Sequence, residues 1–422
     1  LWFWNYFSCK NMIIWKYFNT IIEFFDIILS KIMIFFIKIY QKTISPDKGI
    51  MSNLFAGRVC CHDPHCSEYA KQCFQRYNFF KAMYMSIDRI SRCVWWFKKH
   101  YDPPKYRIVF FSWAQIAVPV LKSLYHDDLF DIVGVVTMSD MPHWRWQSLQ
   151  ENIIKLTAKS LGIDDKKIYN PDRLHPTKSK EWNLFYNQMK SINPDYYVVI
   201  AYWKILPQAY LDIPKILPVN VHGSLLPNYR WASPIQSIFL DNWDKQTIKT
   251  WITLMQMTAW CDEWPFFAQQ KYNLDLNDTV VHLIDRIQHD WPSFLLDKLH
   301  WYAKWYYNLN EQDISLVSMS KKIAKQDGEI NPFNQNLGEI FAKYRAFALW
   351  PKIFFIHKKK RFVIEKIVCD KKHFNITKNK VFAKWKNLHP AIIEIAIRPS
   401  WKSNINWQDF VNWYIINKKE DF

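Results

Sequence analysis

The stretch VNVHGSLLPNYR, residues 219–230, decides how the rest of the chain is organised. A buried apolar run, residues 196–201, precedes it, and a polar, turn-rich run follows it. Asn220 and His222 lie two positions apart, so an extended backbone directs both side chains to the same side. An amide donates hydrogen bonds, and an imidazole exchanges protons near neutral pH. The pair predicts a reactive site at a strand end, although an isolated Asn-x-His also fits an ordinary polar loop.

A second turn-like loop, AWCDEW at residues 259–264, brings a carboxylate into the prediction through Asp262. Asn, His and Asp together suit acyl transfer to an amine. The amide donates to the oxygen on which charge develops, and the imidazole moves the proton that the amine loses. The carboxylate orients the imidazole or takes part in the proton relay. The sequence therefore predicts that these two loops meet.

The middle of the chain alternates between apolar runs and helical patterns. Residues 108–111, 132–137 and 197–201 read as buried strands, and residues 118–125, 153–161 and 180–192 read as helices. Such alternation predicts an α/β fold, a doubly wound parallel sheet with helices on both faces. Ligands of such sheets bind beyond the carboxyl ends of the strands. The stretch at residues 219–230 lies beyond such an end.

The residues that follow His222 resemble the signature of the methionyl-tRNA formyltransferases. The similarity rests on SLLPNYR at residues 224–230 and ASPIQ at residues 232–236. AVPVL at residues 117–121, AYWKILP at 201–207 and TLMQM at 253–257 occur in the same order, from about residue 107 to about 416. A set of that length is far more specific than one motif. The resemblance implies a formyltransferase domain followed by a small β-barrel domain of OB-like type.

The resemblance also implies a reaction, formyl transfer from 10-formyltetrahydrofolate to the amino group of methionyl initiator tRNA. It assigns catalysis to Asn220, His222 and Asp262 and expects no metal. It assigns the substrate entrance to a set of loop residues: Ser224, Leu225, Leu226, Pro227, Tyr229 and Arg230. Arg145 corresponds to a loop that reaches the tRNA acceptor stem. A folate-dependent formyltransferase acting on a sugar nucleotide or purine precursor is one alternative. A role of the N-terminal part as a membrane-surface insertion factor is the other.

The net charge of +18 favours a polyanion or an anionic membrane surface as partner, or serves solubility. After about residue 330, a helix is expected at residues 337–347 and strands at 352–356, 361–369 and 391–397. These strands predict a small barrel that carries basic residues: Lys358, Lys359, Lys360 and Arg361. A basic barrel suits a nucleic-acid backbone. We expect it to bind tRNA, although any single lysine run also fits a solvated loop.

The first 39 residues are rich in Ile, Phe, Trp and Tyr, but charged residues interrupt every span of about 18 residues. This pattern favours an amphipathic helix that lies on an anionic membrane surface. A helix buried in its own domain, or residues upstream of the true start, are the alternatives.

YQKTISP at residues 40–46, with Cys60, Cys66 and Cys93, resembles the membrane protein insertion efficiency factors over about residues 34–104. Cys61, His62 and His65 add metal-type ligands, yet the spacing is not a paired Cys-x-x-Cys pattern. Structural thiols in a small helical unit are favoured over zinc.

These patterns predict four parts of the chain: a helical, Cys-containing segment at residues 1–104, a catalytic domain at 105–305, a linker at 306–330 and a C-terminal barrel at 331–422. Asp102, Pro103 and Pro104 mark the first boundary, because proline stops helices and stiffens linkers. We expect the protein to act in the cytoplasm, at the inner face of the membrane.

Glycine and tryptophan counts are unusual, at 7 and 23 residues. Ordinary usage predicts about 30 glycines in a chain of this length, which matches the two counts together. Tryptophans stand where the formyltransferases carry glycine: Trp144, Trp146, Trp203, Trp231, Trp251, Trp260, Trp264, Trp291, Trp401 and Trp413. An indole in a tight turn is costly where glycine is free to adopt positive φ. We infer a gene in which UGA encodes glycine, against the alternative of a naturally tryptophan-rich chain.

Overall fold

The structure is a computed structural model. It describes residues 25–45, 49–50, 62–91, 100–101, 104–142, 149–172, 174, 180–257, 262–263, 265–305, 309–331, 335–371, 392–399 and 404–406. Two compact units share the chain. One comprises residues 1–106 with 128–131, and the other comprises residues 107–127 with 132–422.

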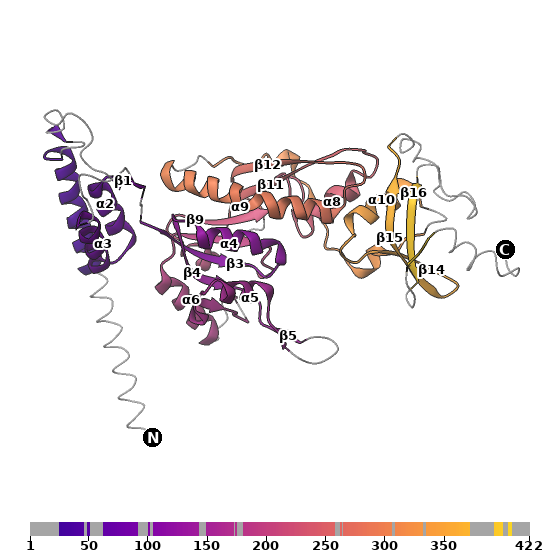
Figure 1. The fold of residues 1–422 in the computed structure, drawn as a ribbon, viewed down its shortest axis with the longest axis horizontal. Coiled ribbons are helices and arrows are strands. Elements are labelled where there is room, and N and C mark those ends of the chain that lie inside the picture. The colour runs from indigo at the N-terminus through magenta and orange to yellow at the C-terminus, as the bar shows by residue number, and fades with distance from the viewer. Residues whose placement is uncertain are drawn as a thin grey trace, which may run out of the picture. The chain divides into compact units, whose positions relative to one another are not determined.

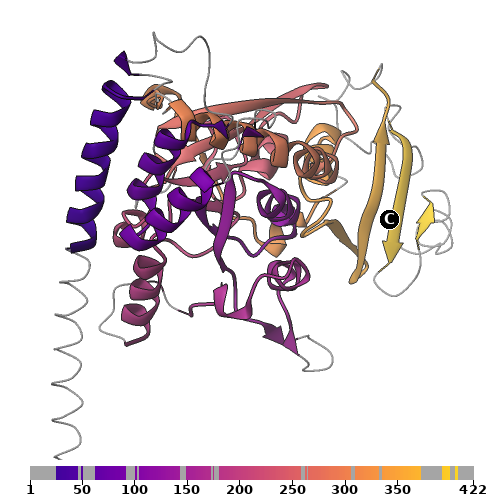
Figure 2. The ribbon, with the colours of Figure 1, turned by 60° about the vertical axis from the view of Figure 1, so that its left-hand side comes forward.

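The first unit is helical. A helix over residues 25–42 packs Met33, Ile34 and Ile37 against a small core that contains Cys73 and Phe74. That core belongs to α2 (Cys66–Arg76) and α3 (Phe79–Ser91), and Figure 2 shows both helices in indigo. A short parallel pair joins β1 (His62–Asp63) to β2 (His100–Tyr101). The expected helical segment is confirmed.

A seven-stranded sheet forms the centre of the second unit. Its order is β12-β11-β9-β8-β3-β4-β7. The bounds are β3 (Tyr106–Phe111), β4 (Phe130–Val136), β7 (Ile168–Tyr169), β8 (Tyr196–Ile200), β9 (Leu217–His222), β11 (Ile248–Gln256) and β12 (Phe266–Leu274). β8 runs parallel to both β3 and β9, whereas β11 is antiparallel to both β9 and β12. The α/β prediction is confirmed, and the antiparallel edge makes the sheet mixed.

Helices cover this sheet. One core cluster joins strand residues such as Val109 and Val199 to Phe185 and Met189 of α6 and to Tyr210 of α7. Because side chains alternate along β3, its remaining buried residues, Tyr106, Ile108 and Phe110, face the other way. The helices labelled in Figure 1 are α4 (Val118–His126), α5 (Ile153–Ser160), α6 (Lys180–Ile192), α8 (Pro234–Asp241) and α9 (Val280–Trp305). The short α7 (Gln208–Leu211) lies between α6 and α8 in the sequence.

The short elements of the second unit are η2 (Gln115–Ala117), η3 (Asp165–Lys167), η4 (Ile314–Leu316), η5 (Lys325–Gly328), β5 (Met141–Pro142), β6 (Leu149–Gln150), β10 (Arg230–Trp231) and β13 (Met319–Ser320). β10 and β13 pair in parallel, so a segment that follows α9 returns to the stretch at residues 219–230. This pairing decides the surroundings of the site.

An antiparallel sheet follows α10 (Leu337–Ala346). Its strands are β14 (Ile353–His357), β15 (Lys360–Cys369), β16 (Ile392–Pro399) and β17 (Ile405–Asn406), in that order. This sheet agrees with the predicted small barrel.

Buried Arg345 joins α10 to the preceding domain. Its guanidinium donates to the carbonyl oxygens of Asp275 and Asp278 at 2.8 and 2.7 Å, and burial lowers its pKa to about 10. Because this pKa lies well above neutral pH, the guanidinium stays charged.

Candidate active site

The end of β9 carries the predicted reactive pair. Asn220 and His222 point to the same side of the strand, as alternation requires. In the register with β11, Met255 lies opposite Asn220 and Thr253 lies opposite His222. The side-chain amide of Asn220 makes no hydrogen bond within the described ranges. That amide is available to a substrate oxygen.

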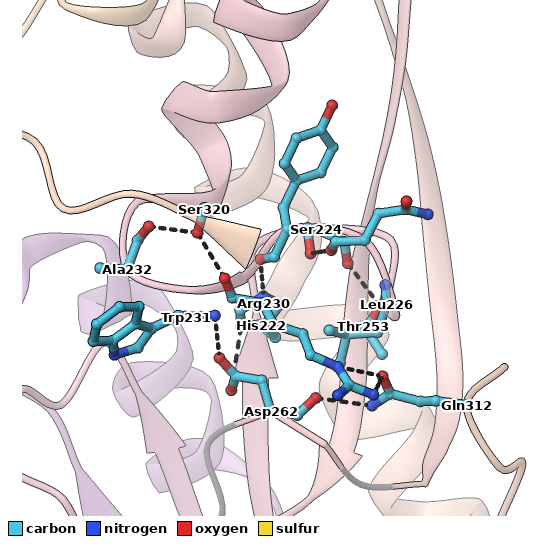
Figure 3. Close-up of polar contacts among 12 residues, drawn as sticks. His222, Ser224, Leu226, Arg230, Trp231, Ala232, Thr253, Asp262, Gln312 and Ser320 are labelled. Carbon is cyan, nitrogen blue, oxygen red and sulfur yellow. Dashed lines mark hydrogen bonds and ion pairs between the residues drawn. The ribbon is translucent and has the colours of Figure 1, made fainter. Parts of the chain in front are cut away.

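The structure brings His222 and Asp262 together (Figure 3). The imidazole is buried, its Nδ1 lies 3.6 Å from Oδ1 of Asp262, and its Nε2 lies 3.0 Å from the carbonyl oxygen of Tyr229. A carbonyl only accepts, so the Nε2 hydrogen points to Tyr229 and leaves Nδ1 toward the carboxylate. A proton on Nδ1 would therefore lie between the imidazole and Asp262.

Asp262 is held in an uncommon backbone conformation. Its φ is 58°, and its Oδ2 accepts a hydrogen bond from the backbone N–H of Trp231 at 2.8 Å. Left-handed backbone costs a residue free energy and persists where the surroundings fix it. The carboxylate is consequently aimed by both its own backbone and the 229–232 loop, as Figure 3 shows.

The loop residues predicted to bind substrate are largely engaged within the protein. Ser224 is fully buried and its Oγ donates to the carbonyl of Asn228 at 2.6 Å. Leu226 and Pro227 are buried, while Leu225 and Tyr229 are partly exposed. The Leu226–Pro227 peptide bond is cis. Among the predicted residues, Leu225 and Tyr229 thus contribute to the exposed surface of this loop.

Thr253 on β11 anchors that loop. From the sequence it was quoted only as part of TLMQM and was given no role in the site. Its hydroxyl donates to the carbonyl of Ser224 at 2.7 Å and accepts from the N–H of Leu226 and from Gln269 Nε2, at 3.3 and 3.2 Å. One hydroxyl has one donor and two acceptor positions, and all three are used. The position of Thr253 opposite His222 would have pointed to a role in the site. That strand register, however, is known only from the folded sheet.

Arg230 is buried and does not face open solvent. Its Nε and Nη2 donate to Oε1 of Gln312 at 3.1 and 2.8 Å, and its Nη1 lies 3.9 Å from Glu263. In this structure the guanidinium ties the loop to the Asp262 segment. Gln312 falls in the predicted linker, and sequence reasoning gave it no role.

The remaining predicted residues are distributed elsewhere. Lys358 and Lys359 are exposed on the tight turn between β14 and β15, and exposed Lys360 begins β15. The guanidinium of Arg361 lies 3.8 Å from the ring centroid of Phe354. Arg145 lies outside the described residues, as do Trp144, Trp146, Trp260, Trp264, Trp401 and Trp413. Among described residues, no group of three His, Cys, Asp or Glu side chains is arranged to hold a metal.

Comparisons with known proteins show the family of this chain. The formyl transferase family matches residues 106–299 of this chain. The family of formyl transferase C-terminal domains matches residues 322–395. A methionyl-tRNA formyltransferase of Caldicellulosiruptor saccharolyticus is 30% identical over 323 residues, which are 74% of this chain and 98% of that protein. The chain belongs to the methionyl-tRNA formyltransferase family. It is therefore a formyl group transferase.

Further similarities concern other relatives and the first part of the chain. The methionyl-tRNA formyltransferase of a Sulfurihydrogenibium species is 31% identical over 59% of this chain and 75% of that protein. A solved methionyl-tRNA formyltransferase from Clostridium thermocellum has 16% identity and a TM-score of 0.44, over 70% of this chain and 99% of that one. The membrane protein insertion efficiency factor family matches residues 29–105.

Proposed function

We propose that this family member transfers a formyl group from 10-formyltetrahydrofolate to the amino group of methionyl initiator tRNA, in translation initiation. The observation that carries the proposal is the His222 imidazole at the end of β9, placed between the Tyr229 carbonyl and the Asp262 carboxylate. Asn220, on the same side of the strand, supplies the amide donor.

The reaction forms one carbon–nitrogen bond and breaks another. The amine nitrogen of the methionyl group attacks the formyl carbon, and the carbonyl oxygen gains negative charge. Asn220 donates a hydrogen bond to that oxygen, where a donor lowers the barrier most. The carbon–nitrogen bond to the folate then breaks as the amine loses a proton and the folate nitrogen gains one. The atoms and charges balance without an oxidant or metal.

His222 and Asp262 handle the proton in this scheme. Nε2 is committed to the Tyr229 carbonyl, so Nδ1 is the ring atom that can take up a proton. Asp262 Oδ1, at 3.6 Å, stabilises the positive ring that results. The proton passes from the amine to this pair and on to the folate nitrogen.

A three-variant experiment tests these catalytic roles. Asn220→Ala, His222→Ala and Asp262→Asn should each lower kcat by roughly 100-fold or more, because each removes a donor or a proton carrier. Asp297→Asn is the matched control, since Asp297 is an exposed carboxylate of α9 paired with Lys298. Formyl transfer is measured with 10-formyltetrahydrofolate and charged initiator tRNA, alongside thermal unfolding. Near-normal turnover of all three folded variants would remove the assignment.

Three segments of the formyltransferase part divide the work in this proposal. Residues 105–305 carry the reaction, residues 306–330 link the domains, and residues 331–422 bind tRNA. The exposed turn at Lys358, Lys359 and Lys360 supports the last role, because clustered cations attract phosphates. Arg361 stacks on Phe354 and holds the base of this turn. Arg145 is proposed as a further tRNA contact on the resemblance alone.

Residues 1–104 are proposed to bind an anionic membrane surface on the cytoplasmic side. The helix over residues 25–42 buries one apolar face, yet Phe25, Ile32, Phe35 and Ile39 remain 43–61% exposed at helical spacing. Within the described residues, no helix is both long and apolar enough to cross a bilayer. Cosedimentation of the full chain with anionic vesicles, and its loss in Phe35→Ser with Ile39→Ser, tests the role. Equal binding by that double variant would contradict it.

A further inference from the structure

A segment after α9 builds one side of the active site. Ser320 Oγ donates to the carbonyl of Arg230 at 2.9 Å, and Ser318 Oγ accepts from the N–H of Tyr229 at 2.9 Å. Asn310 exchanges two backbone hydrogen bonds with Phe266, at 2.8 and 3.0 Å. Residues 309–320 are thereby fixed to both the 229–232 loop and the start of β12. A flexible connector would not make this many directed contacts.

Gln312 stands between these two attachments and contacts both halves of the site (Figure 3). Its side chain is buried, its Oε1 accepts from two nitrogens of Arg230, and its Nε2 donates to the backbone carbonyl of Asp262 at 3.0 Å. The opposite amide orientation would set N–H groups against the guanidinium and oxygen against a carbonyl. Only the observed orientation satisfies all three partners.

Asp262 needs such support because of its backbone. With φ at 58°, its peptide is held by Gln312 at the carbonyl and its carboxylate by the N–H of Trp231. These two contacts leave Oδ1 as the oxygen nearest to His222 Nδ1. Releasing the carbonyl would let the residue relax toward ordinary backbone and turn the carboxylate away from the imidazole.

We propose that Gln312 is a positioning residue that fixes Asp262 against His222, so that this part of the linker belongs to the catalytic site. The inference rests on the proposed function for its activity readout. It also makes Arg230 a structural partner of Gln312 within the site.

Gln312→Glu separates the two contacts of the amide. A carboxylate still accepts from Arg230, with a stronger charge-assisted bond, but it opposes the carbonyl of Asp262. We expect kcat to fall at least 10-fold, KM for both substrates to stay within about 3-fold, and thermal stability to hold. Gln326→Glu is the matched control, because Gln326 is an exposed glutamine of the same linker with no side-chain contact among described residues.

A double-variant cycle distinguishes positioning from general damage. If Gln312 acts through Asp262, adding Gln312→Glu to Asp262→Asn should change kcat by less than about 2-fold. If the two residues acted independently, their fold losses in kcat would multiply. The pH profile of kcat in Gln312→Glu should also approach that of Asp262→Asn. Unchanged kcat in Gln312→Glu, or a multiplied loss in the double variant, overturns the proposal.

A readout without turnover separates this inference from the proposed function. The ring signals of His222, assigned by comparison with His222→Ala in histidine-labelled protein, report the group beside Nδ1. In Gln312→Glu they should move toward their positions in Asp262→Asn, whatever reaction the site performs. Unmoved signals overturn the positioning role, while moved signals in a chain that shows no formyl transfer would leave it standing and reject the function.

Discussion

Single residues around His222 are placed by backbone demands as much as by chemistry. Tyr229, Trp231, Ser233 and Asp262 all have positive φ, between 58° and 81°. Non-glycine residues avoid that region unless their surroundings compensate. Gly223 meets a different demand, since a Cβ there would lie 2.8 Å from Ile235 Cγ1. The surrounding structure therefore maintains several locally unfavourable backbone conformations at this site.

Trp231 provides the residue-scale test of the inferred glycine code. Its φ is 81° and its side chain is 59% exposed, so the indole costs backbone strain and buries little. Trp231→Gly should leave the free energy of unfolding unchanged or raise it by up to about 1 kcal/mol. Trp203, 57% exposed without positive φ, is the control, and Trp203→Gly should destabilise slightly.

Chemical denaturation measures the free energy of unfolding of both tryptophan variants. Equal destabilisation by the two would contradict a glycine requirement at residue 231. Trp251 and Trp291 also lack positive φ, so the backbone makes no such demand at those positions. Peptides from the native host decide the code itself: tryptophan in them at residue 231 would reject it. If they carry glycine, changing all ten tryptophans to glycine should restore folate binding and activity together.

Thr253 gives a second residue-scale prediction. Thr253→Val keeps the shape of the side chain but removes one donated and two accepted hydrogen bonds, which leaves buried partners unpaired. We expect a loss of about 2 kcal/mol in the free energy of unfolding. The control is Thr250→Val on the same strand, because the Thr250 hydroxyl is buried without a hydrogen-bond partner among the described residues. A larger loss from Thr250→Val would refute the argument.

At the scale of elements, charges as well as backbone join β15 to β16 and to Lys352, the residue before β14. Glu365 accepts from Lys352 Nζ at 2.5 Å and from Arg398 Nε at 2.6 Å. Burial by itself raises the pKa of Glu365, but these two hydrogen bonds outweigh it and the pKa is lowered below 4.5. The carboxylate is the form that stabilises the sheet, so the contribution is present above the unfolded pKa.

Acid should therefore weaken this sheet through Glu365. The stability difference between the natural chain and Glu365→Gln, about 1 kcal/mol at neutral pH, should shrink as the pH falls below the unfolded value of 4.5. Glu394→Gln is the control, since Glu394 pairs with Lys366 at the exposed surface. Thermal unfolding across this pH range measures both. A difference that grows in acid has the wrong sign and would reject the linkage.

At the scale of the formyltransferase part as a whole, the linker is continuous with both functional regions. Residues 309–320 contact the active-site loops, and the N–H of Ile330 donates to the carbonyl of Phe354 on β14 at 2.9 Å. β14 leads directly into the basic turn at Lys358. Reciprocal hydrogen bonds between Asn277 and the backbone of Cys369 add a second tie to β15. These contacts fix the basic sheet to the catalytic sheet.

Removal of residues 331–422 tests the sheet as a tRNA platform. Truncation should weaken tRNA binding and flatten its salt dependence, because phosphate contacts release counterions. A milder variant, Lys358→Ser with Lys359→Ser and Lys360→Ser, should lower the salt slope by roughly 2–3. Lys166→Ser with Lys167→Ser on η3 is the surface control. Binding titrations at several salt concentrations measure the slope, and an identical slope in all chains would count against the platform.

The sequence by itself determined the α/β alternation, the helix at α10, the strands β14 to β16 and the pairing of Asn220 with His222 on one strand face. These follow from local periodicity, which fixes how neighbouring residues share a face. Only the tertiary structure decided that Thr253 lies opposite His222, that Arg230 is buried against Gln312, and that a supposed linker supports Asp262. Such contacts join residues dozens of positions apart, and their register is set by sheet pairing and loop closure, which no local pattern encodes.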